Sequence, residues 1–242
     1  SRFLNGGQNE LNKIVLRSMW PAAWRTAIGA VMSLGVSQGM AITMANVLVA
    51  GEAASVQLAL RVMQIISSFS QVPFYTRIPA LNRLRANNQE LPLILMAQSV
   101  MRLSFWVYLI GAIAVDLFVR KLLIFVDSQT QFPDQIFWVI LVAAVFLERF
   151  GAMHIQLLLT SNKAIAHIAN GITGLIWVFL MVYIFPIIGY LALPVSMLLS
   201  YIAWYVWYSA MHSYRALPNI SVWHFESKSS LLPFILIVLW IV

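Results

Sequence analysis

The chain has 242 residues, of which 61% are apolar and only 10% are Asp, Glu, Lys or Arg. An ordinary soluble domain carries about 25% charged residues, so this composition argues strongly against a soluble enzyme. The chain has no cysteine, which excludes disulfides, thiolate metal sites and a cysteine nucleophile. A net charge of +7 would suggest nucleic acid as a partner, but the basic residues lie at the edges of apolar runs and not on one face.

The apolar runs predict an all-α, polytopic membrane helix bundle with six transmembrane helices and a truncated seventh. A bilayer crossing takes about 20 apolar residues. The predicted spans are 26–51, 53–75, 98–119, 135–160, 164–185 and 191–211. The last two come from one uncharged stretch that is too long for a single crossing. Pro186, Gly189 and Pro194 predict a tight turn that divides it.

The ends of the chain suggest a piece of a longer membrane protein. The final apolar run, 231–242, is too short to span and predicts the start of a further helix. The first residue is Ser1, without a signal-peptide pattern. We therefore expect an interfacial linker over 1–23, a six-helix lobe over 24–215, and a connector with the start of a cut-off helix over 216–242.

Lysine and arginine are concentrated in alternate connections between the predicted spans. By the positive-inside rule, this asymmetry places both ends of the lobe and the 77–97 loop in the cytoplasm. Within that loop, residues 79–92 are a candidate for a short interfacial helix that turns Leu81, Leu84 and Leu91 toward lipid.

Polar residues follow one face of the second predicted span. They are separated by alternating steps of 4 and 3 residues, and comprise Gln57, Arg61, Gln64, Ser68, Gln71 and Tyr75. Lipid does not tolerate such a stripe, so it must face either a neighbouring helix, as a polar seam, or a water-filled cavity. The permanent cation of Arg61 favours the cavity, because a seam needs no charge.

The fourth predicted span carries Glu148 and Arg149 near its middle. Adjacent residues point about 100° apart on a helix, so we expect the two not to pair well with each other. Arg149 shares a face with Gln156 and Thr160 and joins the candidate binding residues. Glu148 is the one carboxylate near mid-membrane and the candidate for proton coupling. A structural role, with each charge neutralised by a different neighbouring helix, stays equally open.

No catalytic constellation stands out elsewhere in the sequence. The four histidines have no histidine or carboxylate partner at ligand spacing, so we expect no metal and no cofactor. The first predicted span contains the small-residue series Gly29, Ser33 and Ser37, which predicts a close helix crossing and says nothing about substrate.

Two stretches resemble a known family: LRSMWPAAWRTAIGAVMSLGVSQG (16–39) and VQLALRVMQIISSFSQVPFYTRIPALNRLRANNQ (56–89). They are similar to the region where members of the multidrug/oligosaccharidyl-lipid/polysaccharide exporter superfamily begin their second six-helix lobe. The polysaccharide-precursor branch, which includes the O-antigen flippases, is closer than the drug-extruding branch. The resemblance implies a bacterial inner-membrane protein of two lobes across a central cavity, with this chain as the C-terminal lobe and the N-terminal lobe missing.

The resemblance also implies a substrate. Flippases of this branch use cavity arginines to hold the carrier's diphosphate, and Arg61 matches by position the arginine early in this helix. The leading expectation is a non-enzymatic flippase that moves polyprenyl-diphosphate-linked oligosaccharide, in contact with membrane lipids and the missing lobe. The aromatic sixth span, with Trp204, Tyr205, Trp207 and Tyr208, offers faces on which sugars can stack.

Two alternatives remain open at this point. A cation-coupled multidrug extruder of the same superfamily would need cavity carboxylates beyond Glu148. A membrane-integral sugar polymerase or acyltransferase would need catalytic residues in a sizeable extramembrane loop, and the 120–134 loop offers few charged residues.

Overall fold

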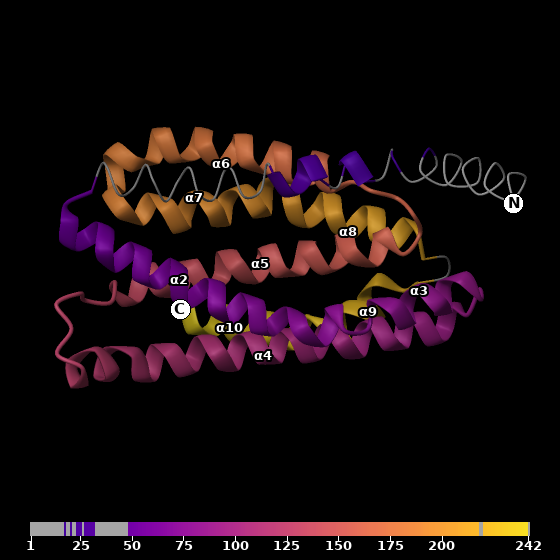
Figure 1. The fold of residues 1–242 in the computed structure, drawn as a ribbon, viewed down its shortest axis with the longest axis horizontal. Helices are drawn as coiled ribbons and strands as arrows, with labels where there is room; N and C mark the ends of the chain where they lie inside the picture. Colours follow the sequence, from indigo (N-terminus) through magenta and orange to yellow (C-terminus); the bar gives the residue numbers. More distant parts are fainter. Residues whose placement is uncertain are drawn as a thin grey trace, which may run out of the picture.

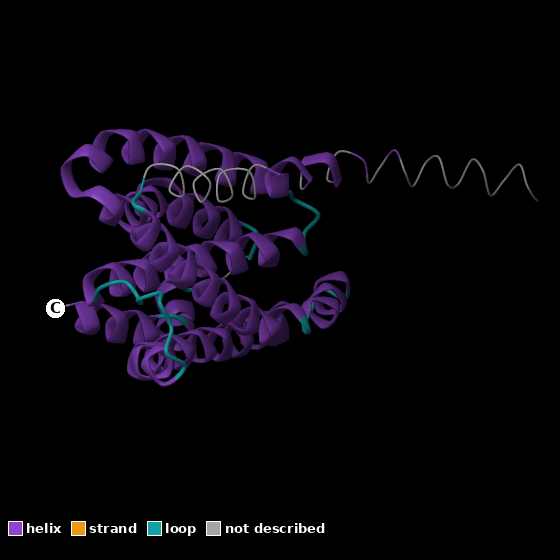
Figure 2. Ribbon diagram, turned by 60° about the vertical axis from the view of Figure 1, so that its left-hand side comes forward, coloured by secondary structure: helices purple, strands orange, loops and turns teal. Residues whose placement is uncertain are grey.

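The structure is a computed structural model that describes residues 48–217 and 220–241, together with Arg17, Trp20, 23–25 and 27–31. Of these residues, 87% are helical and none lies in a strand, which confirms the predicted all-α class. Short loops join the helices (Figure 2). The elements are α2 (Ala50–Tyr75), α3 (Ile78–Ala86), α4 (Glu90–Phe125), α5 (Gln135–Leu159), α6 (Ala166–Ile188), the 3-10 turn η1 (Gly189–Leu191), α7 (Ala192–Ser200), the π-helical turn η2 (Tyr201–Tyr205), α8 (Val206–Arg215), α9 (Val222–Ser229) and α10 (Leu231–Ile241).

The long helices run back and forth between two ends of the bundle (Figure 1). One end holds the start of α2, the 126–134 loop and the turn at Gly189. The opposite end holds α3, the 160–165 turn and the end of α8. This alternation matches the order of connections that the charge pattern predicted. Which end is cytoplasmic stays a prediction.

Helix α5 is the centre of the bundle. It packs against α2, α4, α7, α8 and α10, and it contributes Phe137, Trp138 and Phe146 to the set of large, fully buried side chains. Asp134 caps its start by accepting a hydrogen bond from the Phe137 backbone N–H at 2.7 Å. A helix that is apolar over most of its length needs neighbours or lipid around it, which agrees with its central place.

The predicted turn between the fifth and sixth spans is confirmed. Helix α6 ends at Gly189, whose φ of +57° suits glycine, and α7 then returns along α6. The Tyr190 hydroxyl donates to the Asp134 carboxylate and so fastens the turn to the start of α5. The outer side of α6 is apolar and exposed, with Leu175, Phe179, Val182 and Ile187 among the uncovered side chains.

By length and composition, two stretches of the described residues could cross a membrane: α5 and 166–215. A third arises if α9 and α10, which are bent by 60° at their junction, count as one span. The stretch 166–215 is folded back at Gly189, so that α6 lies beside α7 and η2. The expected first span, 26–51, falls largely outside the described residues, as does the 1–23 linker. The six-span arrangement remains a prediction.

Some boundaries and faces differ from the sequence analysis. The third predicted span is longer, since α4 is one helix of 36 residues. Leu81 was expected to face lipid, but it is fully buried because α3 packs against α4, whereas Leu91 is exposed as expected. The sixth span is not uniform, because the π-helical turn η2 separates α7 from α8.

Candidate functional site

The polar stripe of α2 stays largely uncovered by the described residues. Arg61, Gln64 and Ser68 are exposed, whereas Gln57 and Gln71 are half-buried. Nη1 of Arg61 donates to Oε1 of Gln64 at 3.3 Å, and the Ser68 hydroxyl donates to the Gln64 carbonyl at 2.8 Å. These bonds link residues one turn apart, so the polar groups satisfy one another along the helix.

The other faces of α2 place the stripe within the bundle. The side that packs on α4 buries Val56, Ala59, Met63, Ile66 and Phe74. On its far flank the stripe borders an exposed apolar edge of Ile65, Phe69 and Val72. The stripe therefore lies between the buried face and an apolar edge. An exposed arginine in this setting needs water, a ligand or another polar surface opposite it.

Glu148 and Arg149 pair directly, so the expectation that they would not was wrong. Nε and Nη2 of Arg149 each donate to a different carboxylate oxygen of Glu148, which makes the pair bidentate. The exposed fractions of the two side chains are 22% for Glu148 and 14% for Arg149. Their backbone positions diverge around the helix, but the long arginine side chain bends back to the nearest counter-charge. In a poorly hydrated interior, that pairing outweighs the geometric preference.

Tyrosines from two other elements lie near this pair. Tyr75, the last residue of α2, lies close enough to Glu148 and Arg149 to interact electrostatically with both charges. Tyr201 and Tyr205 of η2 interact with the pair in the same way. The predicted site residues thus form two groups, one on α2 and one on α5, which meet at Tyr75. Arg61 lies fourteen residues before Tyr75, about 21 Å along the helix axis.

Tyr201 and Tyr205, four residues apart in the π-helical turn, lie side by side near this pair. Their ring centroids lie 5.5 Å apart, and Tyr205 is buried, with 4% of its surface exposed. An ordinary α-helix separates residues i and i+4 by one full turn, and the extra residue of a π-helical turn changes which way the following side chains point. Such turns are frequent at functional sites. Tyr205 is one of the four aromatics noted in the predicted sixth span, but no pattern in the sequence indicated η2.

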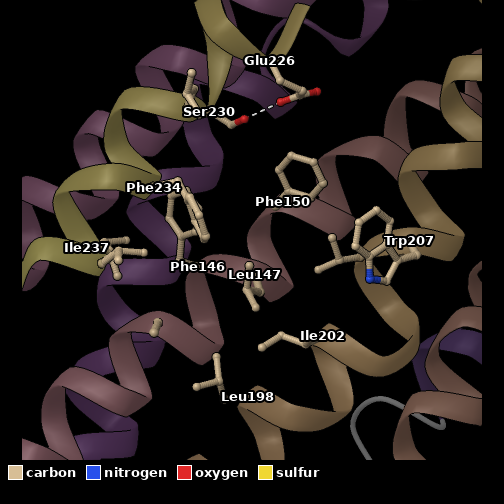
Figure 3. Close-up of a pocket in the computed structure, with 14 residues that line it drawn as sticks. Phe146, Leu147, Phe150, Leu198, Ile202, Trp207, Glu226, Ser230, Phe234 and Ile237 are labelled. Atoms are coloured by element: carbon tan, nitrogen blue, oxygen red, sulfur yellow. Dashed lines mark hydrogen bonds between the residues drawn. The ribbon is translucent and has the colours of Figure 1, made fainter. Parts of the chain in front are cut away.

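The other aromatics of the sixth span point in different directions. Trp204 stacks on Tyr208, with centroids 5.0 Å apart, and Tyr208 in turn contacts His212. Trp207 is 70% exposed. It lines an apolar cavity of about 490 Å³ that lies between α5, the α7–α8 segment and the α9–α10 segment (Figure 3). Glu226 and Ser230 supply the polar groups of this cavity, and Phe146, Ile202 and Phe234 are among its apolar walls.

A second close contact between titratable side chains joins segments that are far apart in the sequence. Nε2 of His154 lies 3.3 Å from Oε1 of Glu226, although the ring is not aligned for a hydrogen bond. Sequence spacing gave this histidine no carboxylate partner, and the tertiary fold supplies one. The two residues are 72 positions apart, so their spacing in the sequence gave no signal.

Arg85 of α3 forms hydrogen bonds with the ends of two other helices, at the end of the bundle that is predicted to be cytoplasmic. Its Nε donates to the Thr160 hydroxyl at 3.3 Å, and its Nη1 donates to the Ala216 carbonyl at 2.7 Å. Burial lowers the pKa of the Arg85 guanidinium, and the nearby Glu90 carboxylate partly opposes that effect. Thr160, expected on the candidate binding face of α5, thus serves a contact between α3 and the ends of α5 and α8.

Within the described ranges, no group of three or more His, Asp or Glu residues could hold a metal ion. Comparison with known proteins found no matching family model, no matching curated protein and no matching solved structure.

Proposed function

We propose that this chain is one lobe of an alternating-access transporter in a bacterial cytoplasmic membrane. The lobe would comprise six transmembrane helices and the start of a seventh, and it would work with an N-terminal lobe of similar size. Its substrate class would be a polyprenyl-diphosphate-linked oligosaccharide, which it would flip from the cytoplasmic to the outer leaflet for polysaccharide biosynthesis.

The observation that carries this proposal is the uncovered polar stripe of α2. Arg61 lies eleven residues into a helix that begins at Ala50, about 16 Å along its axis. A membrane core is about 30 Å thick, so a spanning α2 would hold the guanidinium close to mid-membrane. A charge at that depth is expensive unless it faces water or a partner. The described helices cover the opposite face, and Arg61, Gln64 and Ser68 are exposed on the side that would line a cavity shared with a second lobe.

The chemistry of the stripe suits a phosphate-bearing substrate. A guanidinium is always charged and presents paired N–H donors that match two phosphate oxygens. Gln64 accepts only one of these donors, at a long 3.3 Å, so the remaining donors of Arg61 can turn to a ligand. Gln57, Ser68 and Gln71 add neutral polar groups along the same face, and Tyr75 extends it to the Glu148–Arg149 pair.

The decisive experiment replaces Arg61 in the full-length protein and measures lipid-linked oligosaccharide on the two leaflets. Arg61→Ala should leave the amount of membrane protein unchanged and cause the substrate to accumulate on the cytoplasmic leaflet. Arg61→Lys should restore transport only in part, because an ammonium keeps the charge and loses the paired donors. The matched control is Arg102→Ala, which removes an exposed arginine from α4. If the Arg61→Ala variant transports normally, the cavity assignment is wrong, and the stripe is a polar contact between packed helices.

A further inference from the structure

The apolar cavity between α5, the α7–α8 segment and the α9–α10 segment has the composition of a site for an apolar ligand. Its described lining is apolar apart from Glu226, Ser230 and the indole N–H of Trp207. Figure 3 shows Glu226 and Ser230 together at one end, with Phe234 of α10 and Ile202 of η2 farther along the cavity. Its volume of about 490 Å³ lies within the roughly 300–1,000 Å³ of ordinary ligand pockets.

The cavity is open to the surroundings of the bundle. Among its walls, Ile202 is 47% exposed, and Phe234 and Val238 are each 41% exposed. Phe146 of α5 is buried and its ring centroid lies 6.1 Å from that of Phe234. Protein interiors leave few voids larger than a water molecule, and apolar walls do not hold water. In a membrane, an apolar group from the surroundings must therefore fill the cavity.

The polar end of the cavity points toward the end of the bundle that holds α3. Tyr214, one residue before the end of α8, donates to Oε1 of Glu226 at 2.5 Å. Helix α10 then leads away from this end, and Phe234 meets Phe146 near the midpoint of α5 (Figure 1). Residues 231–238 rise about 10 Å, and one leaflet takes up about 15 Å of the hydrocarbon core. The cavity thus follows the course of one lipid chain from the surface toward the midplane.

The protein surface beside the polar end is basic. Lys228 of α9 lies two residues after Glu226, Arg215 follows Tyr214 directly, and both cations are exposed. The Glu226 carboxylate is occupied by the protein's own donors, because the Tyr214 and Ser230 hydroxyls both donate to it. Exposed lysine and arginine next to a membrane surface attract lipid phosphate groups. The charges therefore favour a phospholipid over a neutral lipid with the same chains.

We propose that the cavity binds one acyl chain of a phospholipid from the leaflet on the α3 side, which is the predicted cytoplasmic side. The chain lies against Phe146, Ile202 and Phe234, and the headgroup phosphate stays outside the cavity near Lys228 and Arg215. Contact with rings on several sides holds this chain more firmly than the chains that touch the rest of the bundle. The inference rests on the membrane placement proposed above and not on the proposed substrate.

The test identifies the lipid that stays with the purified full-length protein. The protein is reconstituted in nanodiscs with a phosphatidylglycerol that carries a photoreactive diazirine midway along one acyl chain. It is then moved into detergent, washed to remove loosely held lipid, irradiated and analysed as peptides by mass spectrometry. We expect the label on peptides that contain Ile202 or Phe234. Because no transport is measured, failure of this proposal can be distinguished from failure of the Arg61 experiment.

Two variants fill the cavity from opposite walls. Ile202→Trp and Val238→Trp should each lower the retained label about tenfold, because the added ring takes the space of the chain. The matched control is Val178→Trp, which adds the same ring to the exposed apolar side of α6 and should leave the label unchanged. Circular dichroism would establish that all three variants keep the helix content of the unaltered chain.

The headgroup is tested with a second probe. A diacylglycerol that carries the same photoreactive chain should be retained less than the phosphatidylglycerol. The double variant Lys228→Gln with Arg215→Gln should remove this difference, because it removes the charges that attract the phosphate. Equal retention of the two probes by the unaltered chain would contradict the assigned phosphate contact.

Three results would overturn the proposal. The first is loss of all label during washing, or equal label in the two cavity variants and the control. The second is displacement of the phosphatidylglycerol by a lower concentration of a polyprenyl phosphate, because the cavity would then hold the chain of the transported substrate. The third is a lipid-free dimer in the native mass spectrum, which would make a second copy of the chain the occupant.

Discussion

The ring of Tyr205 lies against Gly151 so closely that a β-carbon at position 151 would fall 2.5 Å from both Cδ1 and Cε1 of the tyrosine. The contact brings the π-helical turn η2 onto the central helix α5, one turn beyond the Glu148–Arg149 pair. Glycine is needed here for space and not for backbone freedom, since the residue lies inside a regular helix.

Gly151→Ala should therefore destabilise the protein, although alanine is the better helix former. The ring of Tyr205 is buried and has little room to retreat, so overpacking should lower the free energy of unfolding by about 1–3 kcal/mol. Thermal unfolding in detergent, followed by circular dichroism, would measure the change. The matched control is Gly51→Ala at the start of α2, where an added methyl group meets nothing within 4 Å. Equal stability of the two variants would contradict the close packing described here.

The bidentate pairing of Glu148 with Arg149 predicts a structural role for Glu148. Removing one partner of a poorly hydrated ion pair leaves the other charge uncompensated, a loss of about 3 kcal/mol or more when burial is complete. Since both side chains are partly exposed, we expect a smaller loss, seen as a reduced folded yield of Glu148→Gln. The double variant Glu148→Gln with Arg149→Gln should recover most of that yield. Transport should be measured on the same variants. A normal folded yield of Glu148→Gln together with abolished transport would contradict the structural role and identify Glu148 as a coupling carboxylate.

The alternating ends of the bundle predict the accessibility of its turns. A cysteine at Gln129 should be labelled from outside intact cells by an impermeant maleimide, whereas cysteines at Asn87 and Lys163 should react only after the membrane is opened. All three positions are exposed, so a negative result cannot be ascribed to burial. If the cysteine at position 87 is labelled in intact cells, the assigned orientation is wrong. The up-and-down order of the helices would not be affected by that result.

The described helices could be located from the sequence because their signals are local. Apolar runs separated by charged or proline-containing turns predicted α2, α4, α5 and the hairpin at Gly189, with errors mostly at the ends. Helix α4 is longer than its predicted span because it also includes the mostly apolar segments 91–97 and 122–125, the second of which follows Arg120 and Lys121. The small residue Gly29 was also correctly expected at a close crossing, since its position leaves 2.9 Å between a β-carbon and the backbone of Ala166.

The contacts that define the site depended on tertiary structure. His154 and Glu226 come together only because α9 folds back beside α5, and no spacing rule connects them. Leu81 is buried because α4 covers it, although its own segment looks like an interfacial helix. Glu148 and Arg149 illustrate a different limit: helix geometry described their backbone directions well, but side-chain length decided the pairing.

The exposed apolar side of α6 would make the helix bundle sensitive to the thickness of a surrounding membrane. Its 23 residues rise about 34 Å, close to the roughly 30 Å of a bilayer's hydrocarbon core. One end of α6 is anchored through Tyr190 to the start of α5, and near the other end Asn170 donates to the Gly29 carbonyl at 3.0 Å. In a thinner bilayer α6 can avoid mismatch mainly by tilting, and these anchors would transmit the tilt to its neighbours. The length of the lipid chains would then change the tilt of the helices in the bundle, independently of any bound ligand.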